Sequence, residues 1–320
     1  MILRVGTRGS ELALFQANAV AALLRERAGV ECDIVVIRTS GDRLAEATLS
    51  QIGGKRLFVK EIEDALLTGE VDLAVHSSKD MPAVLPAGLT IGAVLPREDA
   101  RDAVVLPVGG TTSFEELVSC LGSSPRIGTS SVRRTAQLSR LFPGARFLPI
   151  RGNLDTRLRK LDSGDYDALV LASAGLIRLH HRARISAALP ITACIPAPGQ
   201  GIIAIEVRAG DERVTPHVAA IADATSRAAF DAERAVVTRL GGGCQMPIGA
   251  YAASADGDLR MLAIVLSLDG TRALRAESRG SMNDAYDVGA AAADDLLAQG
   301  ADEILADVER VHAAVEGLQP

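Results

Sequence analysis

Cysteine is scarce and scattered in this sequence, with only four among 320 residues. Cys32, Cys120, Cys194 and Cys244 lie far apart, and no C-x-x-C pair or Cys/His ligand spacing accompanies them. A disulfide framework and a zinc site are therefore excluded as the basis of the fold, and we expect no bound metal. The first three lie in or beside apolar stretches and are interpreted as small core residues. Cys244 has a different setting, between a glycine run and a proline.

Long apolar runs are missing as well, and we expect no leader sequence. The longest run, ALVLASAGLI at 168–177, is far shorter than the ~18 residues that a membrane span needs. The first residues, MILRVGTRG, lack the basic and apolar regions of a signal peptide. We therefore expect a cytoplasmic protein that does not bind membranes. The formal net charge of −6 also disfavours a nucleic-acid partner.

Lysine is rare too. It occurs only at positions 55, 60, 79 and 160, while the other thirty of the 34 basic residues are arginine. A retained lysine in such a chain indicates a position where a compact point charge is needed.

Hydrophobic residues, at 48%, are sufficient for a well-packed chain of two or three domains.

Strand and helix patterns alternate over the first two-thirds of the chain. A short strand at 2–6 precedes a helix at 11–27 with Ser10 as its N-cap, and the alternation continues to a strand at 166–172. This order predicts parallel sheets covered by helices, with ligands at the carboxyl ends of the strands. After about residue 222 a helix, three strands joined by Asp-Gly turns and two closing helices follow. This part is predicted to be a smaller, antiparallel α+β module.

A cluster of polar residues, HSSKDMP at 76–82, follows a buried strand. It places hydroxyl donors, the cation of Lys79 and the carboxylate of Asp80 at one strand end. Asp80 could there hold a cationic intermediate or an N–H donor. The alternative is a polar loop without a catalytic role.

A second cluster, GTSSVRR at 128–134, places hydroxyl and backbone N–H groups at a helix start, with Arg133 and Arg134 in the first turn. This arrangement indicates an anion site. It is not a P-loop, because the GxxxxGK[ST] spacing is absent. The alternative is an N-capped surface helix with solvated arginines.

Four further arginines follow strands or strand–turn units, namely Arg8, Arg151, Arg157 and Arg178. Each alone is typical of a protein surface. Together they would line a cleft between two α/β lobes, which in an acidic protein indicates a small ligand with several negative charges. Carboxylates and phosphates fit this pattern equally well.

The stretch TRLGGGCQMPIG at 238–249 presents Cys244 on a glycine run that ends at Pro247. A buried structural cysteine needs no such approach, so the thiol is predicted to face another group. A nucleophilic cysteine would need a base, and none of the five histidines is near Cys244 in the sequence. A Cys–His hydrolase therefore has no support from the sequence. A two-lobed binding module for small anions, without catalysis, is the other alternative.

Eight segments in order resemble the porphobilinogen deaminase family, also called the hydroxymethylbilane synthases. They run from near residue 3 to the C-terminal helices, and no single one would be sufficient. The segments are TRGSELALFQA (7–17), IGGKRLFVKEIEDALL (52–67), DLAVHSSKDMP (72–82), REDARDA (97–103), GTSSVRR (128–134), RGNLDTRLRKLDSGDYDALVLA (151–172), PAPGQG (196–201) and GGGCQMPIGAYA (241–252).

The resemblance implies two periplasmic-binding-protein-like α/β lobes with mainly parallel sheets, plus a C-terminal α+β domain with a small antiparallel sheet. We expect residues 1–98 and 199–220 to form the N-terminal lobe and residues 99–198 the second lobe. Residues 221–320 would form the domain that tethers the cofactor.

The resemblance also implies an activity. The family joins four porphobilinogen molecules head to tail into hydroxymethylbilane, with loss of ammonia at each addition, in tetrapyrrole (heme) biosynthesis. A dipyrromethane cofactor, made from the substrate, is bound through a thioether to the cysteine that Cys244 matches. Asp80 matches the catalytic aspartate, which stabilises cationic states near the pyrrole nitrogens. The acetate and propionate groups of the pyrroles would account for the arginines.

Other positions match the family residue by residue. The cofactor-binding positions correspond to Lys55, Lys79, Asp80, Asp102, Thr129, Ser131, Arg133, Arg134 and Arg208. The positions that hold the incoming and growing chain correspond to Arg8, Ser10, Arg151, Arg157 and Arg178. The sequence departs from the family at Gln51, where lysine is frequent, and at Gly241, where glutamate is frequent. The implied partners are porphobilinogen and the growing pyrrole chain, for a monomeric enzyme that hands its product to the next enzyme of the pathway.

Overall fold

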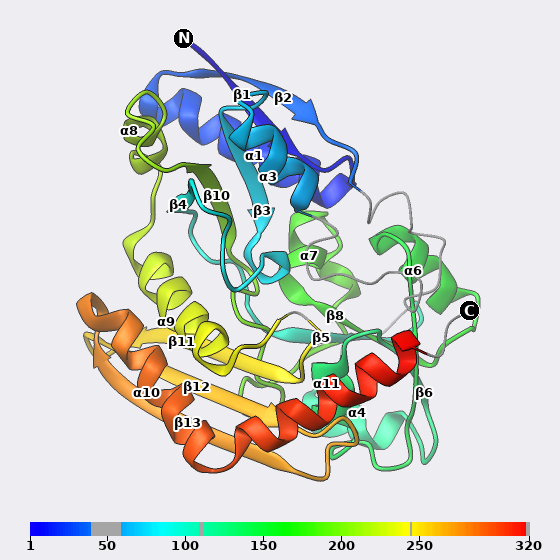
Figure 1. Cartoon of the computed structure of the whole chain (residues 1–320). Coiled ribbons are helices and arrows are strands. Elements are labelled where there is room, and N and C mark those ends of the chain that lie inside the picture. Colours follow the sequence, from blue (N-terminus) through cyan, green and yellow to red (C-terminus); the bar gives the residue numbers. More distant parts are fainter. Residues whose placement is uncertain (40–58, 109–111, 244, 318–320) are drawn as a thin grey trace.

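The computed structural model describes residues 1–39, 59–108, 112–243 and 245–317. Two five-stranded sheets and one three-stranded sheet organise these residues. In Figure 1 the first sheet lies at the top, the second at the right and the third at the lower left. No helix in the described ranges combines the length and the hydropathy that crossing a membrane requires.

Each sheet carries its own helices. The first unit comprises β1 (Ile2–Thr7), α1 (Glu11–Ala28), β2 (Glu31–Val36), α3 (Lys60–Leu67), β3 (Leu73–Ser77), β4 (Leu89–Val94), β10 (Ile203–Arg208) and α8 (Thr215–Ala219). The second comprises β5 (Asp102–Val105), α4 (Phe114–Cys120), β6 (Arg126–Gly128), α5 (Val132–Leu138), β7 (Arg146–Leu148), α6 (Leu154–Asp162), β8 (Ala168–Ala172), α7 (Ser173–Arg178) and β9 (Ala187–Ala188). The third comprises α9 (Ala224–Leu240), β11 (Ile248–Ala255), β12 (Asp258–Leu266), β13 (Ala273–Ser281), α10 (Ala285–Ala298) and α11 (Ala301–Gly317).

Helix α1 shows how local sequence sets an element. The Ser10 hydroxyl accepts a hydrogen bond from the Ala13 amide, as expected for an N-cap. Gly29 ends the helix at a φ of 65°, a left-handed conformation that glycine adopts without a steric penalty. The apolar face of α1 then packs on the first sheet through Val20 and Leu24.

The two-lobed α/β class expected from the sequence is confirmed, but the two large sheets are mixed rather than mainly parallel. In the order β2-β1-β3-β10-β4, β1 runs parallel to β2 and β3, whereas β10 is antiparallel to both of its neighbours. In the order β7-β6-β8-β5-β9, β5 is likewise antiparallel to β8 and β9. The reason is the path of the chain between the lobes. β10 begins beside the last residue of β3, and β5 begins beside the last residue of β8. Each therefore runs in the direction opposite to that neighbour.

Each lobe contains an Arg–Asp ion pair of the same geometry. Both pairs lie at the edge of the sheet away from the segments that connect the lobes. Arg4 of β1 donates from its backbone N–H to Asp72 Oδ2 (2.8 Å) and from its guanidinium to both Asp72 oxygens and to the carbonyl of Gly69. Arg126 of β6 makes the same contacts with Asp167, including a backbone hydrogen bond of 2.7 Å, and with the carbonyl of Gly164. The two lobes therefore share one structural motif, an Arg–Asp ion pair that joins neighbouring strands.

The third unit contacts both lobes. Phe230 of α9 packs in an apolar cluster with Met81 and Ile91 of the first lobe, and Ile264 of β12 packs against Ala136 of α5 in the second. Glu233 of α9 is fully buried and accepts hydrogen bonds from Arg97, from the Gly199 amide (2.6 Å) and from the Ala252 amide (2.7 Å). One carboxylate thus joins the third unit to both chain segments that cross between the lobes.

The described cysteines differ in exposure. Cys194 is buried, as the sequence predicts, and Cys32 is half-buried. The prediction is wrong for Cys120, which is exposed. It lies at the end of α4, a short surface helix that buries only Leu117.

Candidate active site

Asp80 stands at the carboxyl end of a buried strand. β3 runs through the core as far as Ser77, and a 3-10 turn, Ser78–Asp80, then turns the chain toward the second lobe. The Met81 amide closes this turn by donating to the Ser78 carbonyl (3.1 Å). Asp80 itself is exposed, so its carboxylate is available to a ligand.

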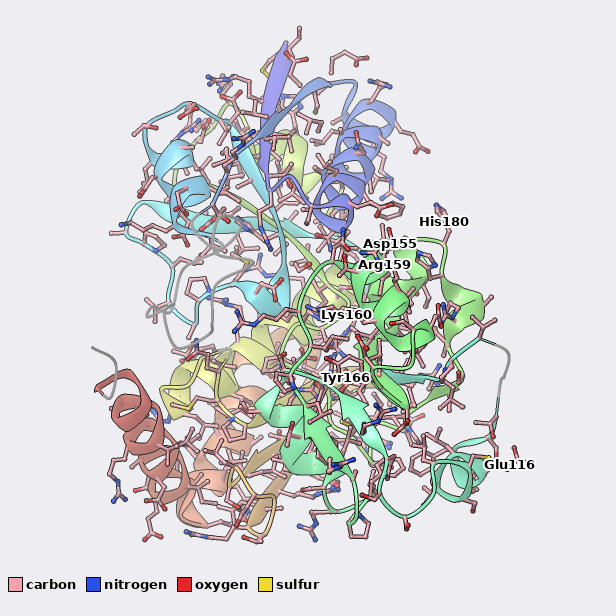
Figure 2. The ribbon with its side chains drawn as sticks, turned by 90° about the vertical axis from the view of Figure 1, so that its right-hand side faces the viewer. Glu116, Asp155, Arg159, Lys160, Tyr166 and His180 are labelled. Carbon is pink, nitrogen blue, oxygen red and sulfur yellow. The ribbon has the colours of Figure 1, made fainter. Side chains whose placement is uncertain are left out.

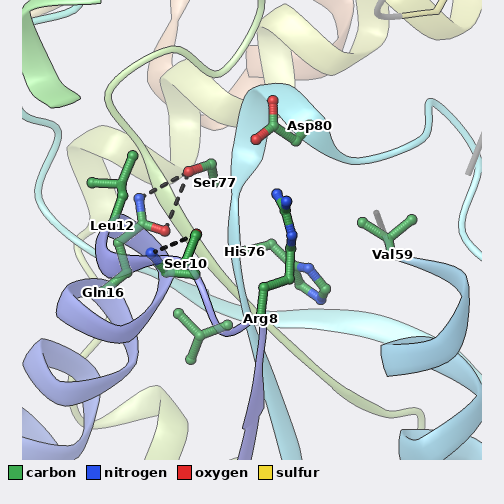
Figure 3. A pocket seen from close by; sticks show the side chains of 10 residues that line it. Arg8, Ser10, Leu12, Gln16, Val59, His76, Ser77 and Asp80 are labelled. Atoms are coloured by element: carbon green, nitrogen blue, oxygen red, sulfur yellow. Dashed lines mark hydrogen bonds between the residues drawn. The ribbon is translucent and has the colours of Figure 1, made fainter. Parts of the chain in front are cut away.

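Side chains of α1 and β3 form a pocket beside Asp80 (Figure 3). Arg8, which follows β1, points its guanidinium toward Asp80 in this view. Ser10 lines the pocket at the start of α1, and the Gln16 amide donates to the Ser77 hydroxyl (2.8 Å). Two sequence-predicted residues, Arg8 and Ser10, therefore meet the predicted catalytic aspartate in one pocket.

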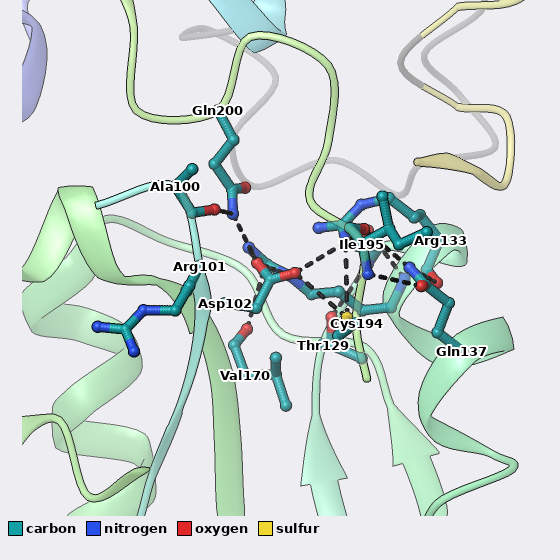
Figure 4. Close-up of polar contacts among 12 residues, drawn as sticks. Ala100, Arg101, Asp102, Thr129, Arg133, Gln137, Val170, Cys194, Ile195 and Gln200 are labelled. Atoms are coloured by element: carbon teal, nitrogen blue, oxygen red, sulfur yellow. Dashed lines mark hydrogen bonds and ion pairs between the residues drawn. The ribbon is translucent and has the colours of Figure 1, made fainter. Parts of the chain in front are cut away.

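A second polar cluster lies at the corresponding strand ends of the second lobe, around Asp102 (Figure 4). Asp102 is fully buried, with Arg133 Nη1 2.7 Å from its Oδ2 and Arg134 Nη2 2.7 Å from its Oδ1. Burial alone would raise the pKa of Asp102, but the two guanidinium groups hold it well below its usual range. These two arginines do not lie solvated on a helix surface, which was the alternative from the sequence.

The loop before α5 provides hydroxyl and amide groups to this cluster. Ser131 caps α5 by accepting from the Arg134 amide, and Thr129, which is buried, accepts from the Ser131 amide (3.2 Å). The neighbouring Ser130 hydroxyl donates to the Ile150 carbonyl (2.8 Å), which places Arg151 next to this loop.

Lys79 and Arg157 interact electrostatically with both groups. Burial lowers the pKa of Lys79 to about 8, an effect that Asp80 opposes and Arg134 reinforces. Burial and then Arg134 lower the pKa of Arg157, with Asp80 again opposing. Both cations therefore interact with Asp80 of one lobe and with Arg134 of the other, across the junction of the lobes.

Three residues of this site were not singled out from the sequence. The Gln200 amide donates to Asp102 Oδ1 (2.9 Å), and the Cys194 thiol donates to Asp102 Oδ2 (3.4 Å). Burial raises the pKa of the Cys194 thiol to about 12, so it stays neutral there. Gln16 is the third, and a signal existed for it, because it is a polar residue on the buried face of an apolar helix. Gln200 lies in the segment PAPGQG (196–201), which the sequence analysis quotes without assigning a role to this residue.

The structure places Arg208 at a distance from Asp80. β10 runs antiparallel to β3, so its last residue lies at the opposite edge of the sheet from Asp80. There the Arg208 guanidinium donates to the carbonyls of Leu66 and Val71, both at 2.8 Å, and to Asp211.

The remaining sequence-predicted residues have other positions. Arg178 is buried, donates to the Gly201 carbonyl (2.7 Å) and lines a neighbouring pocket with Phe15 and Glu98, rather than the Asp80 pocket. Lys55, Gln51 and Cys244 lie outside the described residues.

The chemistry of these groups suits a ligand with several carboxylates. Four cationic side chains, those of Lys79, Arg133, Arg134 and Arg157, surround the carboxylates of Asp80 and Asp102, which leaves an excess of positive charge. Arg133 and Arg134 are buried, so an excess of positive charge beside them is costly without an anion. Figure 2 shows that Asp155 and His180 lie at the edge of the second lobe that faces the first, whereas Glu116 lies at the far end.

Comparison with known proteins gives full-length similarity. Residues 3–216 match the family described as porphobilinogen deaminase, dipyromethane cofactor binding domain, and residues 228–298 match porphobilinogen deaminase, C-terminal domain. The porphobilinogen deaminase of Moorella thermoacetica is 45% identical over 98% of this chain and 99% of its own length. That of Bordetella parapertussis is 47% identical over 96% of both, and that of Desulforudis audaxviator is 48% identical over 95% of this chain and 97% of its own length.

Two solved structures cover about two-thirds of this chain at low identity. The periplasmic VFT2 domain of Bordetella pertussis BvgS is 18% identical, with a TM-score of 0.41 over 69% of this chain and 86% of that chain. An ancestral cationic amino acid solute binding protein is 17% identical, with a TM-score of 0.41 over 68% of this chain and 86% of that chain.

Proposed function

The chain belongs to the porphobilinogen deaminase family, and from this premise we propose how its residues carry out the family's reaction. The enzyme is a transferase of tetrapyrrole (heme) biosynthesis that joins four porphobilinogen molecules head to tail into hydroxymethylbilane and releases ammonia at each addition. Its cofactor is dipyrromethane, which supplies, when bound, the pyrrole to which the first substrate molecule is added.

One observation carries the assignment of roles: Lys79, next to Asp80 in the first lobe, interacts electrostatically with Arg133 and Arg134 of the second lobe, and Arg157 interacts with both Arg134 and Asp80. Arg133 and Arg134, held by Asp102 from behind, would bind the carboxylates of the cofactor with charge-assisted hydrogen bonds, together with Lys79, Thr129 and Ser131. These donors are fixed before the ligand arrives, which reduces the reorganisation needed on binding.

The pocket of Arg8 and Ser10 would hold the carboxylates of incoming porphobilinogen next to Asp80. The Asp80 carboxylate then faces the positive charge that develops on the substrate as ammonia leaves, and it stabilises that charge. Arg151 and Arg157, near the cofactor cluster, would bind carboxylates of the growing chain. Cys244 follows the end of α9 and is proposed as the thioether tether.

The substitution Asp80→Asn tests this function. It keeps the size and hydrogen-bonding capacity of the side chain but removes its charge. We expect turnover to fall by ~10²–10³ or more, while the protein still folds and still carries its cofactor. The cofactor is measured by intact mass under denaturing conditions, as two porphobilinogen units less two ammonia, an increment that Cys244→Ala should abolish. Near-parental turnover by Asp80→Asn would remove Asp80 from the mechanism, and a parent chain without the increment would favour the non-catalytic binding module.

Further parts of the proposal concern organisation and cellular context. We propose the domain limits 1–98 with 199–220, 99–198 and 221–320, and the first two are supported by the residues that build each large sheet. We also propose a cytoplasmic monomer that hands its product to the next enzyme of the pathway. The exposed large hydrophobic side chains of the described residues come from different elements, which supports a monomer. Light scattering during size-exclusion chromatography measures the oligomeric state.

A further inference from the structure

Helix α9 of the third unit holds the loop that carries Asp80. Arg234, near the middle of α9, donates from Nη1 to the carbonyl of Pro82 (2.9 Å) and from Nη2 to the carbonyl of Ala83 (2.6 Å). These two carbonyls come two and three residues after Asp80. A guanidinium presents its donors in a fixed fork, so two adjacent carbonyls are held in one orientation.

Other contacts hold this loop on its N-terminal side and in its middle, and Arg234 holds its C-terminal side. On the N-terminal side, the Ser78 amide donates to the Ile202 carbonyl (3.0 Å). Met81, in the middle, packs against the buried ring of Phe230, and the guanidinium of Arg234 lies 5.3 Å from the centroid of that ring. The turn is thus anchored to β10 before Asp80 and to α9 after it.

The surroundings of Arg234 favour this position for a cation. Burial lowers the pKa of Arg234, and the carboxylates of Asp231 and Glu206 oppose that effect, while Arg227 adds to it. Glu206 is fully buried, and its Oε2 lies 3.1 Å from Nε2 of His76, which lines the Asp80 pocket. Its Oε1 has no hydrogen-bond partner among the described residues. The Glu206 carboxyl group is therefore buried beside the pocket wall, and it interacts with Arg234 of α9.

We propose that Arg234 is a positioning residue for Asp80: through the carbonyls of Pro82 and Ala83 it fixes the catalytic loop against α9. The same helix ends at Leu240 and leads into the glycine run before Cys244. The position of the catalytic carboxylate is thereby tied to the helix from which the cofactor-tethering segment departs. This proposal rests on the function assigned to Asp80 above.

The substitution Arg234→Met tests the proposal, with Arg227→Met as the matched control. Arg227 lies on the same helix, its guanidinium is 5.9 Å from the centroid of the same Phe230 ring, and it donates to the Ile91 carbonyl of β4 rather than to the catalytic loop. In the holoenzyme, Arg234→Met should lower kcat by about 10–100-fold, because small displacements of a catalytic group have effects of that order. KM for porphobilinogen should change less than about threefold and the cofactor increment should be complete, since the binding residues are untouched.

Arg227→Met should keep kcat within about threefold of the parent, and Arg234→Lys, which restores a donor and the charge, should recover part of the lost kcat. Hydrogen exchange gives a second readout that does not depend on activity. Amides of residues 78–84 should exchange faster in Arg234→Met than in the parent or in Arg227→Met.

Parental kcat in Arg234→Met, unchanged exchange at 78–84, or an equal loss of kcat in Arg227→Met would each overturn the proposal. So would a loss of kcat that only follows a loss of cofactor. Asp80→Asn separates this result from a failure of the proposed function. If Asp80→Asn is inactive while Arg234→Met is unaffected, only the positioning role is wrong.

Discussion

The substitution of Asp102 by asparagine should destabilise the protein more than the same substitution at Asp72. Both carboxylates are almost fully buried and both bind arginines. They differ in their partners. The side chains of Arg133 and Arg134, which bind Asp102, are 4% and 10% exposed, whereas those of Arg4 and Arg213, which bind Asp72, are 44% and 49% exposed.

The size of each effect follows from what happens to the partner cations. Asp102→Asn leaves two buried guanidinium groups with neutral acceptors in place of a carboxylate, namely the asparagine amide oxygen and the carbonyls of Ile195 and Val170. Breaking a buried ion pair in this way costs about 3–5 kcal/mol. Asp72→Asn leaves arginines that water can solvate. Its cost should be limited to hydrogen bonds with a buried acceptor and a largely exposed ion pair, about 1–2 kcal/mol.

Equilibrium urea unfolding in a Cys244→Ala background measures both effects without a contribution from the cofactor. In the parental background, intact mass should show cofactor loss in Asp102→Asn, because Arg133 and Arg134 lose their support, but full occupancy in Asp72→Asn. Equal losses of stability at the two positions would refute the argument that burial of the partner cations decides the cost. Full cofactor occupancy in Asp102→Asn would refute its role behind these arginines.

Two further predictions concern the cations of the cluster. Arg133→Leu and Arg134→Leu should leave mostly cofactor-free protein, whereas Arg151→Leu should allow assembly and impair elongation; equal occupancy by intact mass in all three would contradict this division. The pKa of Lys79, at about 8, lies below the ordinary ~10.5 expected in the unfolded chain, so the unfolded chain binds more protons between these values and stability should rise with pH there. Urea unfolding of Cys244→Ala at pH 7, 8 and 9.5 should show this rise, and Lys79→Met should remove it; the same rise in Lys79→Met would assign it to another group.

Elements with local signals could be predicted from the sequence, and elements defined by distant partners could not. α1 was expected at 11–27 and spans Glu11–Ala28, because Ser10 and Gly29 mark its ends. β4 and β10 were not anticipated. Each has six residues, as β1 does, so length is not the reason. Their direction depends on which edge of the first sheet the chain reaches when it passes between the lobes.

The same distinction applies to the site. Asp80 and Lys79 follow a parallel strand, as do Arg133 and Arg134, so strand order alone placed them at facing edges. Arg208 also ends a strand, but this strand runs the other way, and no local signal shows its direction. Arg178 is the last residue of α7, the helix that follows β8, and it lines a neighbouring pocket. Gln200 lies in a segment that the sequence analysis quotes, but its hydrogen bond to Asp102, 98 residues away in the chain, required the structure.

The two lobes share a structural motif and carry different side chains at the carboxyl ends of their parallel strands. Arg-x-Gly-Thr occurs at residues 4–7 and again at 126–129, and each arginine binds an aspartate three residues after a glycine, Asp72 or Asp167. These pairs lie at the amino ends of the parallel strands, away from the junction of the lobes. At the carboxyl ends the chain continues as RGSEL in one lobe and SSVRR in the other. The first sequence starts a long helix whose Gln16 binds Ser77 beside Asp80, and the second directs two arginines onto Asp102. The Arg–Asp pairs therefore join the strands at their amino ends. The residues at the carboxyl ends can then differ between the lobes and serve different functions.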